Sequence, residues 1–213
     1  MEHTWNRSHP GATSDTGDLM KKFESIGTPL EDVVIIQPHL FSDTRGFFLE
    51  SYNAEEFTLL GILEVFVQDN HSCSRKGVIR GLHYQSRYPQ GKLVRVLRGS
   101  IYDVIVDIRK GSPKYGMNYG IVLSSDTPRM VYIPPGFAHG FLALEDRTEV
   151  HYKTTDFYHP EYDAGIRWND PTLGIQWPLI ENGIEHPLLS PKDALLPFFS
   201  EINSPFQYSS VEQ

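Results

Sequence analysis

From Val33 to Thr154 the chain alternates short apolar segments with turn residues, and this pattern limits the fold more than any other feature of the sequence. Short segments rich in Val, Ile, Tyr and Phe and bounded by Gly, Pro, Asp or Ser are typical of β-strands. Helical periodicity is weak and predicts only short helices, at Leu19–Ile26, Asn53–Leu60 and Pro191–Phe199. Many short strands with little helix predict an all-β fold, an antiparallel sandwich or jelly roll. The predicted strands are Val33–Gln37, Gly46–Asn53, Phe66–Ser72, Val78–Gln85, Leu93–Leu97, Ser100–Ile108, Asn118–Ser124, Met130–Ile133, Phe141–Leu144 and Glu149–Thr154.

The clearest predicted strand, Ile101–Ile108, has two different faces. Side chains alternate along a strand, so its even-numbered residues form a wholly apolar face. The opposite face carries Asp103 and Asp107 between isoleucines. We interpret this mixed face as the solvated side of a sheet.

The length of 213 residues fits one domain with appendages. Residues 1–30 are mostly polar, and we predict that they form a flexible N-terminal extension. Residues 31–213 are predicted to form a single jelly-roll domain. After Thr155 the sequence becomes irregular and rich in Pro, Asp, Asn and Trp, so this part is expected to wrap around the barrel.

Composition excludes several classes of partner. The formal net charge of −8 argues against nucleic acid and against an anionic membrane surface. No apolar run approaches the length of a transmembrane helix, and the N-terminus lacks the apolar region of a signal peptide. A single cysteine, Cys73, cannot form a disulfide framework, which suits the reducing cytosol. We therefore expect a cytoplasmic protein without nucleic-acid or membrane partners.

Two polar residues interrupt the apolar strand Val78–Gln85. Arg80 and His83 are three positions apart and would ordinarily face opposite sides of a sheet. Gly81 lies between them and predicts a bulge that brings both side chains to one side. Such a cluster of a cation and a proton acceptor within an apolar strand indicates a functional site.

A second histidine, His139, begins a strand after the turn Pro134–Gly136. In the cupin class of jelly rolls, Pro-x-Gly-x-x-His places the histidine inside the barrel. A cupin metal site also needs His-x-His followed by a glutamate, but Tyr84 and Gln85 follow His83. Metal sites require three or four converging ligands, so we expect no metal and no cofactor. Two interior histidines without a metal suit proton transfer.

These residues carry a resemblance to a known family. The chain resembles the dTDP-4-dehydrorhamnose 3,5-epimerases and their relatives that act on other nucleotide-linked 4-keto sugars. The resemblance covers Val33 to Pro197 and implies a cupin-like antiparallel jelly roll, a double-stranded β-helix. It also implies a homodimer with an exchanged N-terminal strand and a nucleotide-sugar substrate. The matching segments are Asp43–Glu50, Gln68–Asn70, Val78–Gln85, Gly91–Val94, Ile133–Phe141, Tyr152–Tyr158 and Trp168–Pro171.

The resemblance assigns four catalytic roles. His83 would be the base that removes a proton next to the ketone, and Asp193 would hold this histidine in position. Lys92 would stabilise the enolate oxygen. Tyr152 would be the acid on the opposite face and goes with epimerisation at C5. The alternatives are a core histidine, a surface aspartate at a helix start, an exposed loop lysine and a packed tyrosine.

The resemblance also implies a set of binding residues, for each of which a purely structural role is the alternative. Arginines would bind the sugar and the diphosphate, because a guanidinium fork matches phosphate oxygens. An aromatic residue would stack on the base, and polar side chains would line the sugar pocket. A further strand would reach into the site of the partner subunit. The arginines are Arg45 and Arg80, and the stacking residue is Tyr158. The pocket residues are Gln68, Asn70 and His139, and the strand that reaches the partner carries Phe48 and Glu50.

The expected function is therefore metal-free epimerisation at C3 and C5 of a dTDP-4-keto-6-deoxyhexose, leading to dTDP-L-rhamnose. An epimerase that inverts C3 only, or one for another nucleotide sugar, is the closest alternative. A metal-dependent cupin enzyme and a non-catalytic sugar-nucleotide binding protein are the alternatives from other classes.

Overall fold

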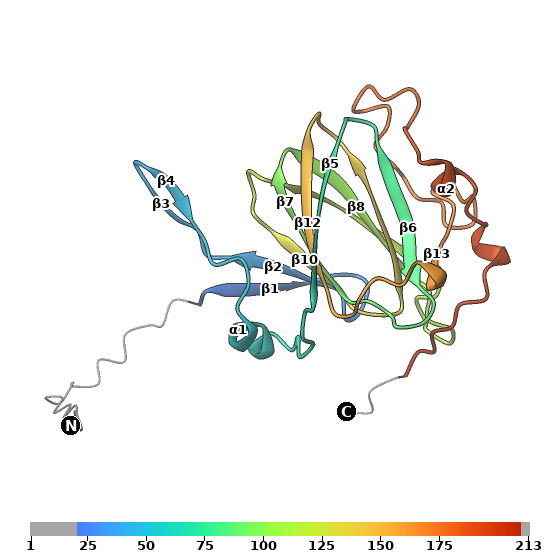
Figure 1. Cartoon of the computed structure of the whole chain (residues 1–213), viewed down its shortest axis with the longest axis horizontal. Helices are drawn as coiled ribbons and strands as arrows, with labels where there is room; N and C mark the ends of the chain where they lie inside the picture. Colours follow the sequence, from blue (N-terminus) through green and yellow to red (C-terminus); the bar gives the residue numbers. More distant parts are fainter. Residues whose placement is uncertain (1–20, 210–213) are drawn as a thin grey trace, which may run out of the picture.

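A computed structural model describes residues 21–209, which form two antiparallel β-sheets packed face to face (Figure 1). The six-stranded sheet has the order β1-β2-β10-β7-β12-β5, and the five-stranded sheet has the order β13-β6-β11-β8-β9. The predicted all-β jelly roll is thus confirmed. The strands are β1 Phe23–Gly27, β2 Val34–Pro38, β3 Phe41–Asp43, β4 Gly46–Phe48, β5 Gln68–Ser74, β6 Ile79–Gln85, β7 Lys92–Arg98, β8 Ser100–Asp107, β9 Asn118–Ser124, β10 Met130–Ile133, β11 Phe137–Ala143, β12 Thr148–Thr154 and β13 Asp163–Gly165. The helices are α1 Ala54–Leu59, α2 Pro191–Ala194 and the 3₁₀ turns η1 Pro160–Tyr162 and η2 Phe199–Glu201.

The main core lies between the two sheets. Strands β7, β10 and β12 contribute their inward residues from one side, and β8, β9 and β11 contribute theirs from the other. Val94, Ile105 and Val150 in this layer are fully buried. The core fills one part of the space between the sheets, and the cavity described below occupies another.

The long segment after β13 covers the outer face of the five-stranded sheet (Figure 1). The apolar face predicted for β8 lies here, packed against side chains such as Leu173, Trp177 and Phe206. The opposite face of β8 is not solvated as predicted: Asp103 and Asp107 are both fully buried and point to the interior side. Each carboxylate is tolerated there because it is paired, Asp103 with a histidine and Asp107 with Arg109.

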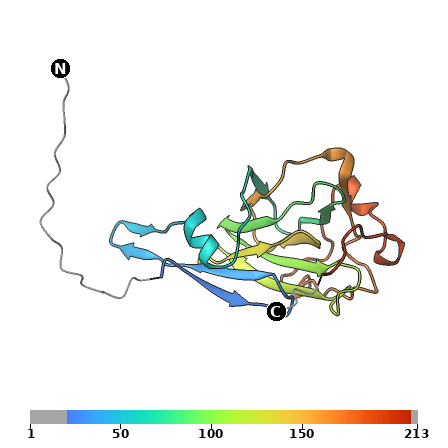
Figure 2. The same ribbon diagram turned by 90° about the horizontal axis from the view of Figure 1, so that it is seen from below.

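Helix α1 covers one end of the outer face of the six-stranded sheet (Figure 2). Asn53 forms its N-cap and accepts hydrogen bonds from the backbone N–H groups of Glu55 and Glu56, at 3.0 and 3.3 Å. Phe57 is buried against the sheet. The predicted helix at residues 53–60 is therefore confirmed within one residue at each end.

The predicted helix Leu19–Ile26 is wrong over its described part, because Phe23–Gly27 forms strand β1, paired with β2. Residues 1–20, which include most of the predicted extension, lie outside the described residues. The predicted helix Pro191–Phe199 is shorter than expected and ends at Ala194. In residues 21–209, no helix is long and apolar enough to span a bilayer.

Strands β3 and β4 form a hairpin that projects away from the sandwich in both views (Figures 1 and 2). This hairpin pairs with neither large sheet. The strand predicted at Gly46–Asn53 ends at Phe48, and Asn53 instead caps helix α1.

Candidate active site

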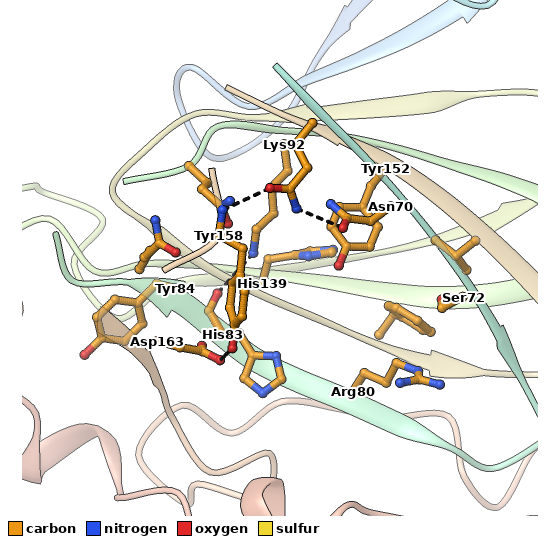
Figure 3. A pocket seen from close by; sticks show the side chains of 15 residues that line it. Asn70, Ser72, Arg80, His83, Tyr84, Lys92, His139, Tyr152, Tyr158 and Asp163 are labelled. Carbon is orange, nitrogen blue, oxygen red and sulfur yellow. Dashed lines mark hydrogen bonds between the residues drawn. The ribbon is translucent and has the colours of Figure 1, made fainter. Parts of the chain in front are cut away.

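A cavity of about 400 Å³ opens between the two sheets, and residues from both sheets line it (Figure 3). Strands β5, β7 and β12 form one wall, and β6 and β11 form the other. The structure brings eight of the twelve predicted site residues to this cavity. They are Gln68, Asn70, Arg80, His83, Lys92, His139, Tyr152 and Tyr158.

An irregularity in β6 directs Arg80 and His83 to the same cavity. The register between β6 and β11 shifts between His139 and Phe141, as in a β-bulge. Gly81 has a φ of +122°, and a Cβ there would lie 2.5 Å from the Cα of Gly140. A residue with a side chain could not take this place. The bulge predicted at Gly81 is therefore confirmed.

His83 forms a dyad with Asp193. Its Nε2 donates a hydrogen bond of 2.6 Å to Asp193 Oδ1, and the two side chains are 31% and 6% exposed. Ser190, the N-cap of α2, accepts from the backbone N–H of Asp193 at 3.0 Å and so fixes the backbone that carries the carboxylate. Burial raises the pKa of Asp193, but the hydrogen bonds from His83 and Ser190 outweigh it, and the pKa lies below its usual value. Asp193 is thus a buried partner of the histidine rather than a surface residue.

Lys92 begins β7 and lies in the cavity wall, not in an exposed loop. Its Nζ donates a hydrogen bond of 3.3 Å to the backbone carbonyl of His83. Burial lowers the pKa of Lys92 to about 8, although Asp163 and Asp103 act in the opposite direction. The site therefore holds a cation that lies next to the His83 backbone and is poorly solvated.

Tyr152 reaches the cavity from β12, in the sheet opposite to the one that carries His83 (Figure 3). Burial raises the pKa of the Tyr152 hydroxyl above its usual value, and the nearby Arg80 opposes this shift. The tyrosine thus keeps its proton through the neutral pH range. A base on one wall and a proton donor on the other can act on opposite faces of a molecule held between them.

The structure contains a second histidine–carboxylate pair that sequence reasoning missed. His139 lies opposite His83 in the β6–β11 ladder, and its Nε2 donates a 2.7 Å hydrogen bond to the buried Asp103. Asp103 shares its face of β8 with Ile101 and Ile105, which are also buried. Alternation separates the two faces of this strand but does not tell which face meets water, so no local signal identified the pair.

Further polar lining residues are held by hydrogen bonds within the protein. Gln68 donates to Asn70 Oδ1 at 3.0 Å, and Arg80 Nε donates to the hydroxyl of Ser74 at 3.1 Å. The Tyr158 hydroxyl donates to Asp163 at 2.8 Å, and this hydrogen bond raises the pKa of Tyr158 to about 12. Sequence reasoning also missed Asp163, which lies in the short strand β13 of an irregular segment.

Three predicted binding residues lie outside the cavity of their own chain. Arg45 and Phe48 are on the projecting hairpin, where the Arg45 side chain is 88% exposed and is paired with Asp43 at 3.0 Å. Glu50 follows the hairpin, accepts from Asn53 at 3.0 Å and forms an ion pair with Lys22. The structure does not bring these residues to the eight that line the cavity.

Across residues 21–209, no cluster of three or more His, Cys, Asp or Glu side chains has the arrangement of a metal site. Each of the two cavity histidines instead uses one ring nitrogen to bind a carboxylate. This arrangement fixes the ring and leaves the other nitrogen for proton transfer.

The fold and the cavity together define a jelly-roll enzyme equipped for acid–base chemistry. A family model described as dTDP-4-dehydrorhamnose 3,5-epimerase matches residues 27–201, and the chain belongs to this family.

Individual relatives agree over most of the chain. The dTDP-4-dehydrorhamnose 3,5-epimerase of Methanothermobacter thermautotrophicus is 51% identical over 82% of this chain and 93% of its own. The crystal structure of a Legionella pneumophila 3,5-epimerase in complex with dTDP-4-keto-L-rhamnose matches with a TM-score of 0.84 and 47% identity, covering 88% of this chain and all of the other. A Bacillus anthracis dTDP-4-dehydrorhamnose 3,5-epimerase with TDP and PPi bound matches with a TM-score of 0.79 and 46% identity, over 83% and 99% of the two chains.

Proposed function

We propose that this protein is an isomerase that epimerises dTDP-4-dehydro-6-deoxyglucose at C3 and C5 to give dTDP-4-dehydro-L-rhamnose, in dTDP-L-rhamnose biosynthesis. The observation that carries this proposal is the pair of opposing cavity walls, with the His83–Asp193 dyad on one and Tyr152 on the other. The relatives that match most of the chain act in the same way according to their names.

The first half of the reaction removes a proton from a carbon next to the C4 ketone. His83 takes the proton, and the electron pair of the C–H bond moves to the ketone oxygen to give an enolate. Asp193 stabilises the imidazolium that forms. Lys92 lies near the general base His83 and stabilises the negative charge of the enolate. Because this charge develops only as the proton leaves, Lys92 lowers the barrier of the reaction rather than only binding substrate.

The second half returns a proton to the opposite face of the same carbon. Tyr152 donates this proton from the opposite wall, and the electron pair of the enolate returns to carbon while the ketone re-forms. The raised pKa of Tyr152 supports this role, because an acid must be protonated when it is needed. The tyrosinate and the imidazolium exchange protons with solvent before the next turnover.

Substrate binding extends over the rest of the cavity. Arg80 and Arg45 bind the diphosphate, and Gln68, Asn70 and His139 contact the sugar. Tyr158 stacks on the base. The exposed position of Tyr158 at the cavity mouth supports a contact with the distal part of a long substrate.

We also propose that the protein is a homodimer with an exchanged N-terminal strand, in which Arg45, Phe48 and Glu50 complete the cavity of the partner. The projecting hairpin supports this, because it exposes three phenylalanine side chains to solvent. The division at residue 30, with a single domain after it, stays a prediction, as does the cytosolic location favoured by a single free cysteine.

The proposal is tested by turnover of dTDP-4-dehydro-6-deoxyglucose in deuterated water, followed by NMR of the product. We expect dTDP-4-dehydro-L-rhamnose with deuterium at both C3 and C5. Deuterium at C3 alone would show a C3-only epimerase, and loss of activity on metal removal would show a metal-dependent cupin enzyme.

The control variant His83→Ala should bind dTDP normally and lose activity by about 10²–10⁴-fold, the usual effect of removing a general base. Ligand binding without turnover in the wild-type protein would instead indicate a non-catalytic binding protein.

A further inference from the structure

The segment at residues 156–159 lies between β12 and η1, belongs to no strand and contributes Tyr158 to the cavity lining. Glutamine side chains, rather than a neighbouring strand, form hydrogen bonds with the backbone of four consecutive residues of this segment. Gln90 donates to the carbonyl of Asp156 at 2.8 Å, and Gln85 donates to the carbonyl of Phe157 at 3.1 Å. The N–H of Tyr158 donates to Gln68 at 3.0 Å, and the N–H of His159 donates to Gln85 at 2.7 Å.

Gln85 is the central member of this set, because it bridges two segments of the cavity mouth. It is the last residue of β6, two positions after His83, and is only 5% exposed. Its carboxamide nitrogen donates both to Phe157 and to the carbonyl of Tyr88, and its oxygen accepts from His159. One donor hydrogen goes to each carbonyl, so both donors of the side chain are used within the protein.

The two segments that Gln85 joins carry exposed aromatic rings, of which Tyr158 lines the cavity. Tyr158, Phe157 and Tyr88 are 50%, 57% and 41% exposed. The rings of Tyr88 and His159 are tilted by 31° with their centroids 4.7 Å apart, and the guanidinium of Arg87 lies 5.1 Å from the centre of the Tyr88 ring. Exposed aromatic faces held in a fixed place are suited to stacking with a nucleobase.

We propose that Gln85 is a positioning residue for the nucleotide end of the cavity, and this inference rests on the proposed nucleotide-sugar substrate. Gln85 fixes the backbone on both sides of Tyr158, and thereby holds the tyrosine ring in the orientation that stacks on the base. Its own polar atoms do not touch the substrate.

The variant Gln85→Met tests this role, because methionine has a similar length, is neutral and makes none of the three hydrogen bonds. The Kd for dTDP, measured by calorimetry, should rise by about 10-fold or more, since stacking on an aromatic side chain contributes strongly to binding of a base. The Kd for inorganic pyrophosphate, which has no base, should stay within about twofold of wild type. In turnover, the KM should rise with the dTDP Kd while kcat changes little.

Gln37→Met is the matched control. Gln37 lies in β2, donates to the carbonyl of Pro38 and accepts from Arg129, and it is not among the residues that line the cavity. This variant should bind both ligands as the wild type does. If Gln85→Met folds poorly, Gln90→Met removes one hydrogen bond of the same segment and should give a smaller rise in the Kd for dTDP alone.

Two results would contradict the inference. An unchanged Kd for dTDP in Gln85→Met would show that Gln85 does not position the ring, and an equal loss of dTDP and pyrophosphate binding would show a general role in folding. A wild-type protein that binds pyrophosphate but not dTDP would instead contradict the nucleotide site itself, and with it the proposed function.

Discussion

Burial raises the pKa of one cavity residue and lowers the pKa of another, and in both residues it favours the neutral form. The hydroxyl of Tyr152 holds its proton more strongly, whereas the ammonium of Lys92 loses its proton more easily. The first shift favours a general acid. The second makes the cation depend on pH close to the neutral range, because the pKa of Lys92 falls to about 8.

The activity should therefore decline as the pH rises through about 8. Lys92 is charged below this pH, and its deprotonation above it removes the stabilisation of the enolate. A profile of kcat/KM against pH reports the pKa values of the free enzyme and should show this alkaline limb. The residual activity of Tyr152→Phe should decline over the same pH range, because Lys92 is intact in this variant. A profile that stays level to pH 9.5 would show that Lys92 is not the group that stabilises the enolate.

At this scale the sequence was informative where the signal is local. Arg80 and His83 share one strand with the glycine that brings them together, so their common location could be predicted. Asp103 could not be assigned correctly from alternation, which separates the faces of a strand but does not tell which face meets water. Its burial depends on His139, 36 positions away in sequence, which supplies the hydrogen bond.

At the scale of elements, the contact between β6 and β11 determines the shape of the cavity. The two strands approach each other closely where Gly81 meets Gly140, and a Cβ on either glycine would lie within 3.0 Å of the other strand. The bulge at this point turns Arg80 toward the cavity on the same side as His83. The catalytic strand therefore requires two small residues from separate parts of the chain.

Gly81→Ala should destabilise the protein by about 2–5 kcal/mol, from overpacking and from the positive φ together. Gly111→Ala is the matched control, because Gly111 also has a positive φ, of +82°, but open space around its Cα. The control should lose only about 1–2 kcal/mol, the cost of the backbone conformation. The free energies of unfolding are measured by urea titration, and they can be compared if the m-value is the same in all variants. Equal losses in the two variants would show that the close approach of β6 and β11 has no energetic consequence.

The elements that sequence analysis missed have few buried side chains. Strand β1 buries only Phe23 and pairs along one edge with β2, so its residues show no strand periodicity. Strand β3 has three exposed residues, and so has β4, the part of the predicted strand Gly46–Asn53 that the structure retains. Apolar alternation arises where one face of a strand is buried against a core. These strands are held mainly by backbone hydrogen bonds, so their sequences do not show the pattern. Strands β8 and β12, which have buried faces, were predicted within one residue at either end. The fully buried β11 begins at Phe137, four residues before the predicted start at Phe141, because the strand resumes directly after the Pro-Gly turn.

At the scale of the whole molecule, the hairpin and the cavity do not meet within one chain. The cavity opens at its mouth to solvent, whereas the hairpin carries an arginine and aromatic rings away from the sandwich (Figure 1). In a two-fold dimer the same exchange would occur twice, so that each cavity receives one hairpin. The position of the hairpin relative to the sandwich could not be predicted from local sequence, since it depends on where the chain leaves β2.

Subunit mixing tests this exchange directly. Arg45→Glu removes the binding residue of the hairpin, and His83→Asn removes the base of the cavity, so each homodimer should be inactive. A mixed dimer, co-expressed and purified through two different tags, should regain about half of the wild-type activity, because one of its two cavities has all of its residues. A mixed dimer of His83→Asn with Lys92→Met is the control and should stay inactive, since each cavity then lacks one of its own residues. Recovery in neither mixture, or elution of the wild-type protein as a monomer, would show that each cavity works without the hairpin of a partner.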